Sequence, residues 1–376
     1  LLCVVWKGAC KLKKRVFLGM LLLFAFSAAA MAAPIDISGS LSAGLAVGLE
    51  ESYYLNPGSE LELNLDHQLG DSAFHVGIRG NYNDGFKIEL DEAYLDYYAE
   101  QFEIRLGKQR LSWGTALQIN PTDVINPVDI EDPLGGKQAL YAAAVDYYLG
   151  YNTKLSAVWV PIFKPALEKI PHPLVPGQVI TPEKVEPKLE KSELGIRASF
   201  MGVNGWDFSA SYFRGWEDFP TVKFGPTGPQ ASFRKTQMFG LDVATTVGDM
   251  GFWAEGAYFL PKDADSYYQL VVGGDYGFQN GLVLIGQYYH RSGDGSVNNV
   301  ILAAEYPFGL MHSAKLGAMY SLDSNEYMIS PEVAFSLADS TSLVAGVQYF
   351  SSSPNDLGMP AMGQNRSMYA KLRIGF

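Results

Sequence analysis

Hydrophobic and polar residues alternate along most of the chain, beginning with the segment 35–49. Leu41 and Leu45 fall on one face of an extended backbone there, and Ser40 and Ser42 fall on the other. A period of two residues is typical of a β-strand with one apolar face. The alternation therefore predicts strands rather than helices.

The same pattern recurs up to the last residue. It predicts strands over 35–49, 61–66, 74–79, 86–98, 102–106, 138–149, 153–162, 192–201, 206–216, 234–247, 251–260, 266–278, 281–291, 297–307, 312–321, 326–337, 342–351 and 366–376. A phase slip near Asp91 predicts a bulge in the fourth strand. Short turns alternate with longer connections, as in outer-membrane barrels. We expect an all-β transmembrane antiparallel β-barrel of about 16–18 strands, since strand boundaries read from sequence slip by a few residues.

One segment, Leu111 to Lys137, breaks the alternation. It reads LSWGTALQINPTDVINPVDIEDPLGGK, with the repeat Asn-Pro-x-Asp at 120–123 and 126–129. Long loops with their own turn chemistry are often functional. Proline fixes the backbone and aspartate bonds back to nearby amides, so such a loop can hold a shape without a core. We call residues 111–137 the central loop, and we expect it to fold into the barrel lumen as the third external loop.

A second long connection, residues 160–190, is rich in proline. Its seven prolines are Pro161, Pro165, Pro171, Pro173, Pro176, Pro182 and Pro187. Two interpretations stay open: an external loop that covers the mouth, or a disordered surface loop.

The N-terminus predicts export. Lys11, Lys13, Lys14 and Arg15 precede the apolar run 16–26, and small residues with an Ala-x-Ala site follow at 30–32. This order is typical of a secretory signal peptide over residues 1–33. The apolar run is short of the roughly 20 residues that a membrane-spanning helix needs. Residues 34–376 would then form the mature barrel domain.

Cleavage changes the charge and the cysteine content. Residues 1–33 hold five of the 28 basic residues, none of the 40 acidic ones and both cysteines, Cys3 and Cys10. The mature chain would carry 23 basic and 40 acidic residues, a net charge of −17. Such a chain is not expected to bind nucleic acid, which needs a basic face, and disulfide or thiolate metal sites are excluded.

The segment that leads into the central loop resembles the porin-like β-barrel family of Gram-negative outer membranes, whose solute here is unassigned. Glu92-Ala-Tyr-Leu-Asp96 is followed by Leu106-Gly-Lys-Gln109, Trp113-Gly114 and the Asn-Pro-x-Asp pair. The resemblance implies a third external loop that folds inward and narrows the pore. The final alternating strand ends in Phe376, which resembles the assembly signal of these barrels and implies recognition by the barrel-assembly machinery.

Candidate pore residues follow from this arrangement. The predicted constriction consists of Trp113, Asn120, Asp123, Asn126, Asp129, Glu131 and Asp132. The predicted basic wall opposite it consists of Arg79, Lys87, Arg105, Arg197, Lys315 and Arg373. Inward-facing acids outnumber these bases, and acidic rings favour cations. We expect passive diffusion of small hydrophilic solutes with a modest cation preference; alternatively, the acids only cap turns and the wall charges only hydrate the channel.

Other chemistry is weighed against this interpretation. His290 and Ser292 share a strand face, as in outer-membrane lipid hydrolases, but they sit beside a predicted rim turn. Trp113 could stack on sugars or anchor the rim. The five histidines show no metal-ligand spacing, and we expect no enzyme activity, cofactor or metal. A barrel that sheathes or docks a partner protein, such as an electron carrier, remains an alternative; a homotrimer in the outer-membrane lipid is also possible.

Overall fold

The computed structural model describes residues 34–49, 55–82, 85–117, 119–130, 136–172, 175, 178–226, 228–293, 295–309, 311–351 and 366–376. The predicted signal peptide, residues 1–33, lies outside the described residues. Among the described residues, no helix has both the length and the apolar character needed to cross a bilayer.

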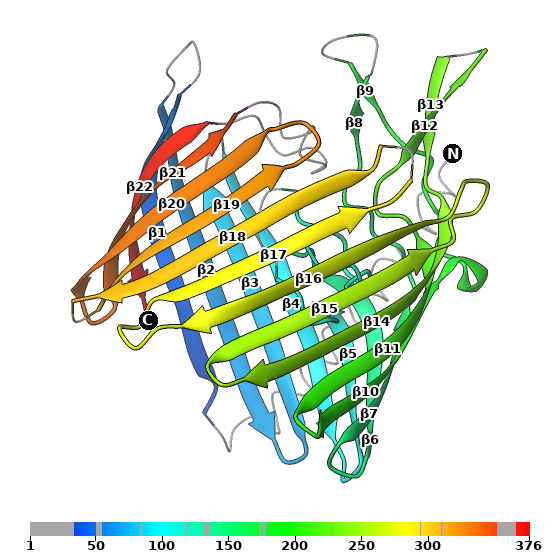
Figure 1. The fold of residues 1–376 in the computed structure, drawn as a ribbon, viewed down its shortest axis with the longest axis horizontal. Helices are drawn as coiled ribbons and strands as arrows, with labels where there is room; N and C mark the ends of the chain where they lie inside the picture. The colour runs from blue at the N-terminus through cyan, green and yellow to red at the C-terminus, as the bar shows by residue number, and fades with distance from the viewer. Residues whose placement is uncertain are drawn as a thin grey trace, which may run out of the picture.

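The wall of the molecule is one antiparallel sheet of 18 strands (Figure 1). The strands are β1 Asp36–Gly48, β2 Leu55–Leu69, β3 Ser72–Tyr82, β4 Phe86–Tyr98, β5 Phe102–Gln109, β6 Leu140–Leu149, β7 Thr153–Val160, β10 Glu193–Val203, β11 Trp206–Trp216, β14 Lys235–Val247, β15 Met250–Phe259, β16 Tyr267–Gly277, β17 Val283–Arg291, β18 Val297–Phe308, β19 His312–Ser321, β20 Tyr327–Ala338, β21 Thr341–Phe350 and β22 Ser367–Gly375.

The sheet closes on itself through β1 and β22. Ser40 pairs with Gly375 and the ladder runs to Gly48 opposite Ser367. Beyond the ladder, Gly39 and Phe376 exchange two backbone hydrogen bonds, of 3.0 and 3.1 Å. Closure leaves no free sheet edge, which is what a sheet within hydrocarbon requires. The prediction of a closed antiparallel barrel is confirmed, with the upper of the expected strand numbers.

Residues on the two faces of β1 differ as the alternation predicted. Leu41 and Leu45 are 47% and 44% exposed on the outside of the ring. Ser40 and Ser42 are buried on the inside, where their hydroxyls donate to Glu62 and Glu60 of β2. Large apolar side chains repeat this outward exposure on the other strands. The outer surface thus forms the apolar band that a transmembrane barrel presents to lipid.

The bulge predicted near Asp91 is also present. The pairing of β3 with β4 shifts between Gly77 and Ile78, so that Asp91 has no partner opposite it. The extra residue turns the Asp91 carboxylate towards Arg79 and Arg110, which bind it. This bulge places an acid at the entrance of the central loop.

The two rims differ. The start of β1, the end of β22 and short turns, such as those at 70–71 and 150–152, lie at one rim, which we call the short-turn rim, and longer connections lie at the other. The connection between β5 and β6 is the third at the longer rim. Residues 160–190 include a short pair, β8 Ile170–Pro171 with β9 Val179–Ile180, followed by the 3-10 turn η2 Leu189–Lys191. The hairpin of β12 Thr221–Gly225 and β13 Gly228–Ser232 was not expected from the sequence.

Candidate channel constriction

The two Asn-Pro-x-Asp repeats of the central loop have different structural roles. In the first, the Asn120 side chain accepts from the Thr122 amide at 3.2 Å and donates to the Trp113 carbonyl at 2.7 Å. The Asp123 amide donates to the Asn120 carbonyl at 3.2 Å, which closes a tight turn. Proline and asparagine at these positions favour such a turn. The first repeat therefore folds the tip of the loop back on its entry.

The second repeat joins the two ends of the loop. Asn126 is fully buried; its side-chain amide donates to the carbonyls of Gln109 at 3.1 Å and Gln138 at 2.8 Å. Its side-chain oxygen accepts from the Leu111 amide at 2.8 Å. One side chain thus bonds the end of β5, the start of the loop and Gln138, which lies two residues before β6. Asn126 holds the base of the loop closed.

The middle of the loop reaches strands far from β5. Glu255, in the middle of β15, accepts from the backbone amides of Thr115 and Ala116, and from the Thr122 hydroxyl at 3.1 Å. Glu255 is 3% exposed. Three donors on one buried carboxylate form a strong attachment, because charge-assisted hydrogen bonds are about twice as strong as neutral ones.

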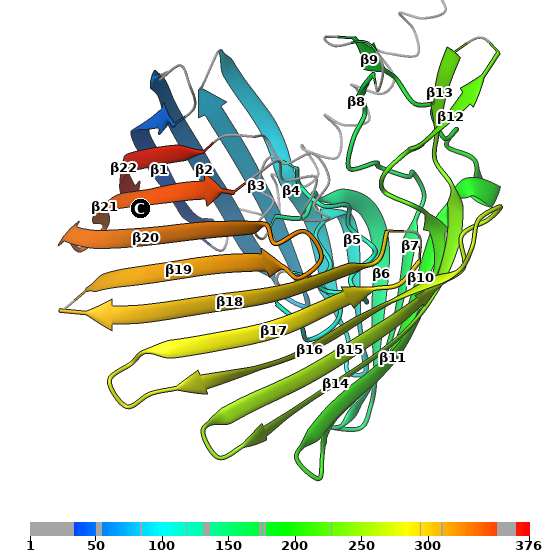
Figure 2. The ribbon, with the colours of Figure 1, turned by 45° about the horizontal axis from the view of Figure 1, so that its top comes forward.

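Gln287 of β17 makes the next attachment. Its side chain accepts from the Leu117 amide at 3.0 Å and donates to the Leu117 carbonyl at 2.7 Å. Around the ring, β17 lies eight strands from β5 in one direction and ten in the other. A loop that starts at β5 and bonds the middle of β17 has to run through the bore. Figure 2 shows this trace within the ring of strands.

Apolar side chains of the loop contact the inner wall on several sides. Trp113 and Ile125 are buried in a cluster with Val158, Phe213 and other residues of β6, β7, β11, β14 and β15. Ile119 packs against two further clusters, one on β15 to β17 and one on β18 to β21. The loop therefore has a continuous apolar attachment as well as polar ones, which explains how it holds its position in a wide barrel.

Gly114 is needed where the loop meets Glu255. Its φ is +87°, and a Cβ atom there would lie 2.3 Å from Asn120 Oδ1, 2.5 Å from Glu255 Oε1 and 2.5 Å from Thr122 Oγ1. A larger residue is disfavoured both by the backbone conformation and by space. The Trp113-Gly114 pair thus has a packing role on the wall.

Asp123 does not face open lumen. It is 8% exposed, accepts from the Trp113 amide at 3.4 Å and lies 3.8 Å from the Lys137 ammonium. Burial raises the pKa of the Asp123 carboxyl above its usual value, and Lys137 opposes that shift. Lys137 also donates to the carbonyls of Asp123 and Asn126. Lys137 is a structural residue that the sequence analysis did not single out.

Of the seven predicted constriction residues, Trp113, Asp123 and Asn126 are buried in the loop's own packing. These three side chains hold the loop in place, and their contact with a solute stays a prediction. Asn120 is half-buried in its turn. Asp129 lies 3.9 Å from Arg79 of β3. The predicted residues Glu131 and Asp132 lie outside the described residues.

The predicted basic residues lie on the wall, each beside an acid. Arg105 binds Asp96 through two hydrogen bonds, of 2.6 and 2.8 Å, and Arg197 binds Asp242 at 2.9 Å. The remaining pairs are Arg79 with Asp91, Lys87 with Glu89, Lys315 with Glu305 and Arg373 with Glu62. The side chains of the far wall that bind the loop are the acid Glu255 and the amide Gln287, and the basic wall stays a prediction.

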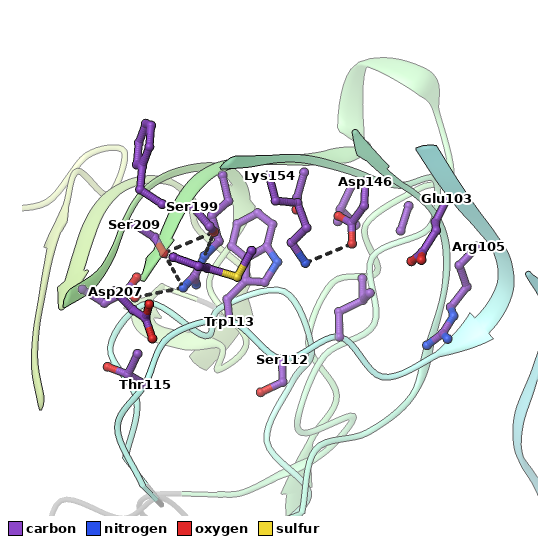
Figure 3. A pocket seen from close by; sticks show the side chains of 18 of the residues that line it. Glu103, Arg105, Ser112, Trp113, Thr115, Asp146, Lys154, Ser199, Asp207 and Ser209 are labelled. Carbon is purple, nitrogen blue, oxygen red and sulfur yellow. Dashed lines mark hydrogen bonds and ion pairs between the residues drawn. The ribbon is translucent and has the colours of Figure 1, made fainter. Parts of the chain in front are cut away.

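A polar basin lies between the loop and the short-turn rim (Figure 3). Its cavity volume is about 400 Å³. Trp113 and Ser112 of the loop form one side, and the ion pair of Lys154 with Asp146, 3.1 Å long, lies on the wall beside them. The basin is a wet vestibule on one side of the loop. No group of three or more potential metal ligands occurs in the described residues.

The fold is a closed antiparallel β-barrel of 18 strands with a loop attached inside its lumen, an architecture shared with solved bacterial β-barrel structures. Two solved structures that it resembles are OccK11 (OpdR) and OccD3 (OpdP), both from Pseudomonas aeruginosa. OccK11 is 10% identical with a TM-score of 0.54, and the alignment covers 91% of this chain and 96% of OccK11. OccD3 is 10% identical with a TM-score of 0.53, at 91% and 90% coverage.

At the level of sequence, one family model matches. Residues 79–136 match a family described as "Protein of unknown function (DUF1302)". The match begins in β3 and includes nearly all of the central loop, so it falls on the segment that crosses the bore. Comparison with curated proteins gave no significant match.

Proposed function

We propose that this protein is an outer-membrane channel of a Gram-negative bacterium through which small hydrophilic solutes diffuse passively. The central loop narrows the bore and sets which solutes pass. Barrels with this many strands leave an aqueous passage unless something fills it. The proposal needs no cofactor and no catalytic step.

The observation that carries the proposal is the attachment of the loop at mid-wall. Glu255 and Gln287 hold residues 115–117 and Thr122 about halfway along β15 and β17. A loop tied there lies across the path of a solute instead of over the mouth. In a passage narrowed in this way, loop and wall side chains are close enough to select by size and charge.

We further propose a modest cation preference. Each predicted lumen base lies within ion-pair distance of an acid. The predicted inward-facing acids outnumber the predicted inward-facing bases. Lys315, for example, stands in register between Glu305 and Glu332. A low-dielectric passage with excess negative charge concentrates cations. In a potassium chloride gradient, the reversal potential should show potassium as the more permeant ion; chloride as the more permeant ion would overturn this part of the proposal.

The first test of the channel proposal is whether the purified protein conducts ions on its own. Signal-processed barrel, folded in detergent and added to a planar bilayer, should give discrete open-channel steps. A folded barrel that stays silent would contradict the channel proposal. It would favour the alternative in which the barrel sheathes a partner protein. The role of Phe376 as an assembly signal and the association into trimers are separate proposals, since neither is needed for conduction.

The lipid-hydrolase alternative gains no support from the contacts of its two residues. The His290 ring bonds the Asn298 side chain at 2.8 Å, and the Ser292 hydroxyl accepts from the Tyr268 amide at 2.8 Å. A general base has to reach its nucleophile, and these two side chains each have another partner.

A further inference from the structure

Four basic side chains gather at the outer face of the wall, at the rim that carries the long connections. They are Lys191, Arg214, Lys235 and Lys262, and together with Trp216 and Gln237 they line a hollow of about 310 Å³. We call these four residues the rim basic cluster. Glu190 is the one acid among the residues that line this hollow.

Alternation places the cluster outside the barrel. On β11, Ser211 and Phe213 are buried inside while Arg214 is exposed on the opposite face. On β14, Met238 is buried inside while Gln237 is exposed beside Lys235 at the strand start. The cluster thus belongs to the face that a transmembrane barrel turns to lipid, not to the lumen.

The charges of the cluster are little neutralised by the protein. Within the described part of the chain, Arg214, Lys235 and Lys262 form no ion pair with an acid, and Lys191 lies 3.8 Å from Glu186. The predicted lumen bases, by contrast, each have an acid within ion-pair distance. A cluster of unneutralised cations at a lipid boundary attracts anions from outside the chain.

The residues that line the hollow contact one another, and apolar surface continues from it. The Lys235 ammonium lies 5.2 Å from the centre of the Trp216 ring, and the Trp216 indole donates to the Lys191 carbonyl at 2.9 Å. Along the same face, Phe239 and Leu241 of β14 are 51% and 65% exposed. Basic groups directly above an apolar band match the two parts of an anionic lipid, a charged headgroup and its acyl chains.

We propose that the rim basic cluster binds the phosphate-bearing headgroup of an outer-leaflet glycolipid, with the acyl chains on the apolar face of β11 and β14. Arg214 is suited to bidentate phosphate binding, and the lysines add charge around it. The proposal rests on the outer-membrane location proposed above, with the long-connection rim at the cell surface. It does not depend on conduction, because the cluster lies outside the bore.

The test measures lipid binding by the full barrel in phosphatidylcholine nanodiscs. Diphosphorylated lipid A is titrated in, and bound lipid is counted by native mass spectrometry. The variant Arg214→Gln/Lys235→Gln/Lys262→Gln should bind lipid A about tenfold to a hundredfold more weakly, since each basic residue near a charged lipid surface contributes to affinity. The control Lys169→Gln/Lys184→Gln/Lys223→Gln removes the same charge from connections at the same rim and should leave binding unchanged.

Three outcomes would overturn the proposal. Equal loss in the control variant would mean general charge attraction. Equal affinity for fully dephosphorylated lipid would mean that phosphate is not recognised. Full displacement by an equimolar amount of inorganic phosphate would mean that the acyl chains contribute nothing and the site takes free phosphate. Heat-modifiable gel migration checks that each variant is folded, and a conducting barrel that fails to bind lipid A would reject this inference alone.

Discussion

Glu255 is the wall residue whose contacts tie the central loop across the bore. Its carboxylate satisfies two backbone amides and a hydroxyl that would otherwise be buried without a partner. The alternation of the strand predicts only that Glu255 faces inward, because alternation gives the face of a residue but not its partner across the lumen. Asn120 and Asn126 occupy the same position in the two Asn-Pro-x-Asp repeats, so the sequence does not distinguish their roles. Their contacts do: Asn126 joins the two ends of the loop, and Asn120 shapes its tip.

Replacing Glu255 should release the loop. Glu255→Leu leaves the amides of Thr115 and Ala116 without an acceptor, at a cost of about 1–3 kcal/mol for each buried unsatisfied group. We expect larger and noisier single-channel currents from a barrel that still folds. The matched control is Glu60→Leu, which removes an inward acid bonded by Ser42 and not by the loop. Equal current changes in both variants would show that charge alone, not loop attachment, is responsible.

Asp218 should make stability depend on pH. It follows β11 in the longer-rim connection, and burial raises its pKa to about 7. An unfolded aspartate loses its proton near pH 4, so the folded state binds more protons between about pH 4 and 7. Its contribution to stability therefore falls as pH rises through that window and stays low above it.

The measurement is the thermal midpoint in one detergent at pH 5 and pH 8. Asp218→Asn should be more stable relative to the parent at pH 8 than at pH 5, by a few degrees, because roughly 1 kcal/mol shifts the midpoint by about 2–4 °C in larger domains. Asp339→Asn, at an exposed turn of the other rim, is the control. An unchanged difference between the two pH values would contradict the assignment.

Among the elements, strands are far better predicted from sequence than connections are. The sequence predicts all 18 wall strands, and 17 of them to within about three residues at each end, because an outside face in lipid and an inside face in water impose a period of two on each. The short strand predicted at 61–66 runs over Leu55–Leu69, since its first residues interrupt the alternation but still pair with β1. The β12–β13 hairpin lies beyond the wall and has no such pattern to reveal it.

The central loop itself should behave as a folded element. In Asn126→Ala, three hydrogen bonds between the loop base, β5 and β6 are lost. At about 1 kcal/mol for each bond, more where a buried group is left unpaired, we expect amide exchange over 111–130 to accelerate by about tenfold or more. Amides of β18 to β20 should keep their rates and serve as an internal control. Faster exchange everywhere would mean that the whole barrel is weakened.

In the whole molecule, the ring of strands and the central loop depend on each other for packing. An 18-strand ring is too wide to be filled by its own side chains, so apolar inner residues such as Val158, Phe213 and Met328 need the loop to cover them. The prolines and the broken alternation of the segment predict a long loop that folds into the lumen. The sequence could not predict that an acid on the far wall would hold it, because that pairing joins residues about 140 positions apart.

The central claim is that the central loop crosses the bore and limits the current. Single-channel conductance in a planar bilayer tests this most directly, with the full barrel compared with a variant in which residues 116–134 are deleted. Both should fold, as judged by heat-modifiable migration, and the deletion should give a clearly higher conductance and pass larger uncharged polymers. An unchanged conductance in the folded deletion variant would contradict the claim.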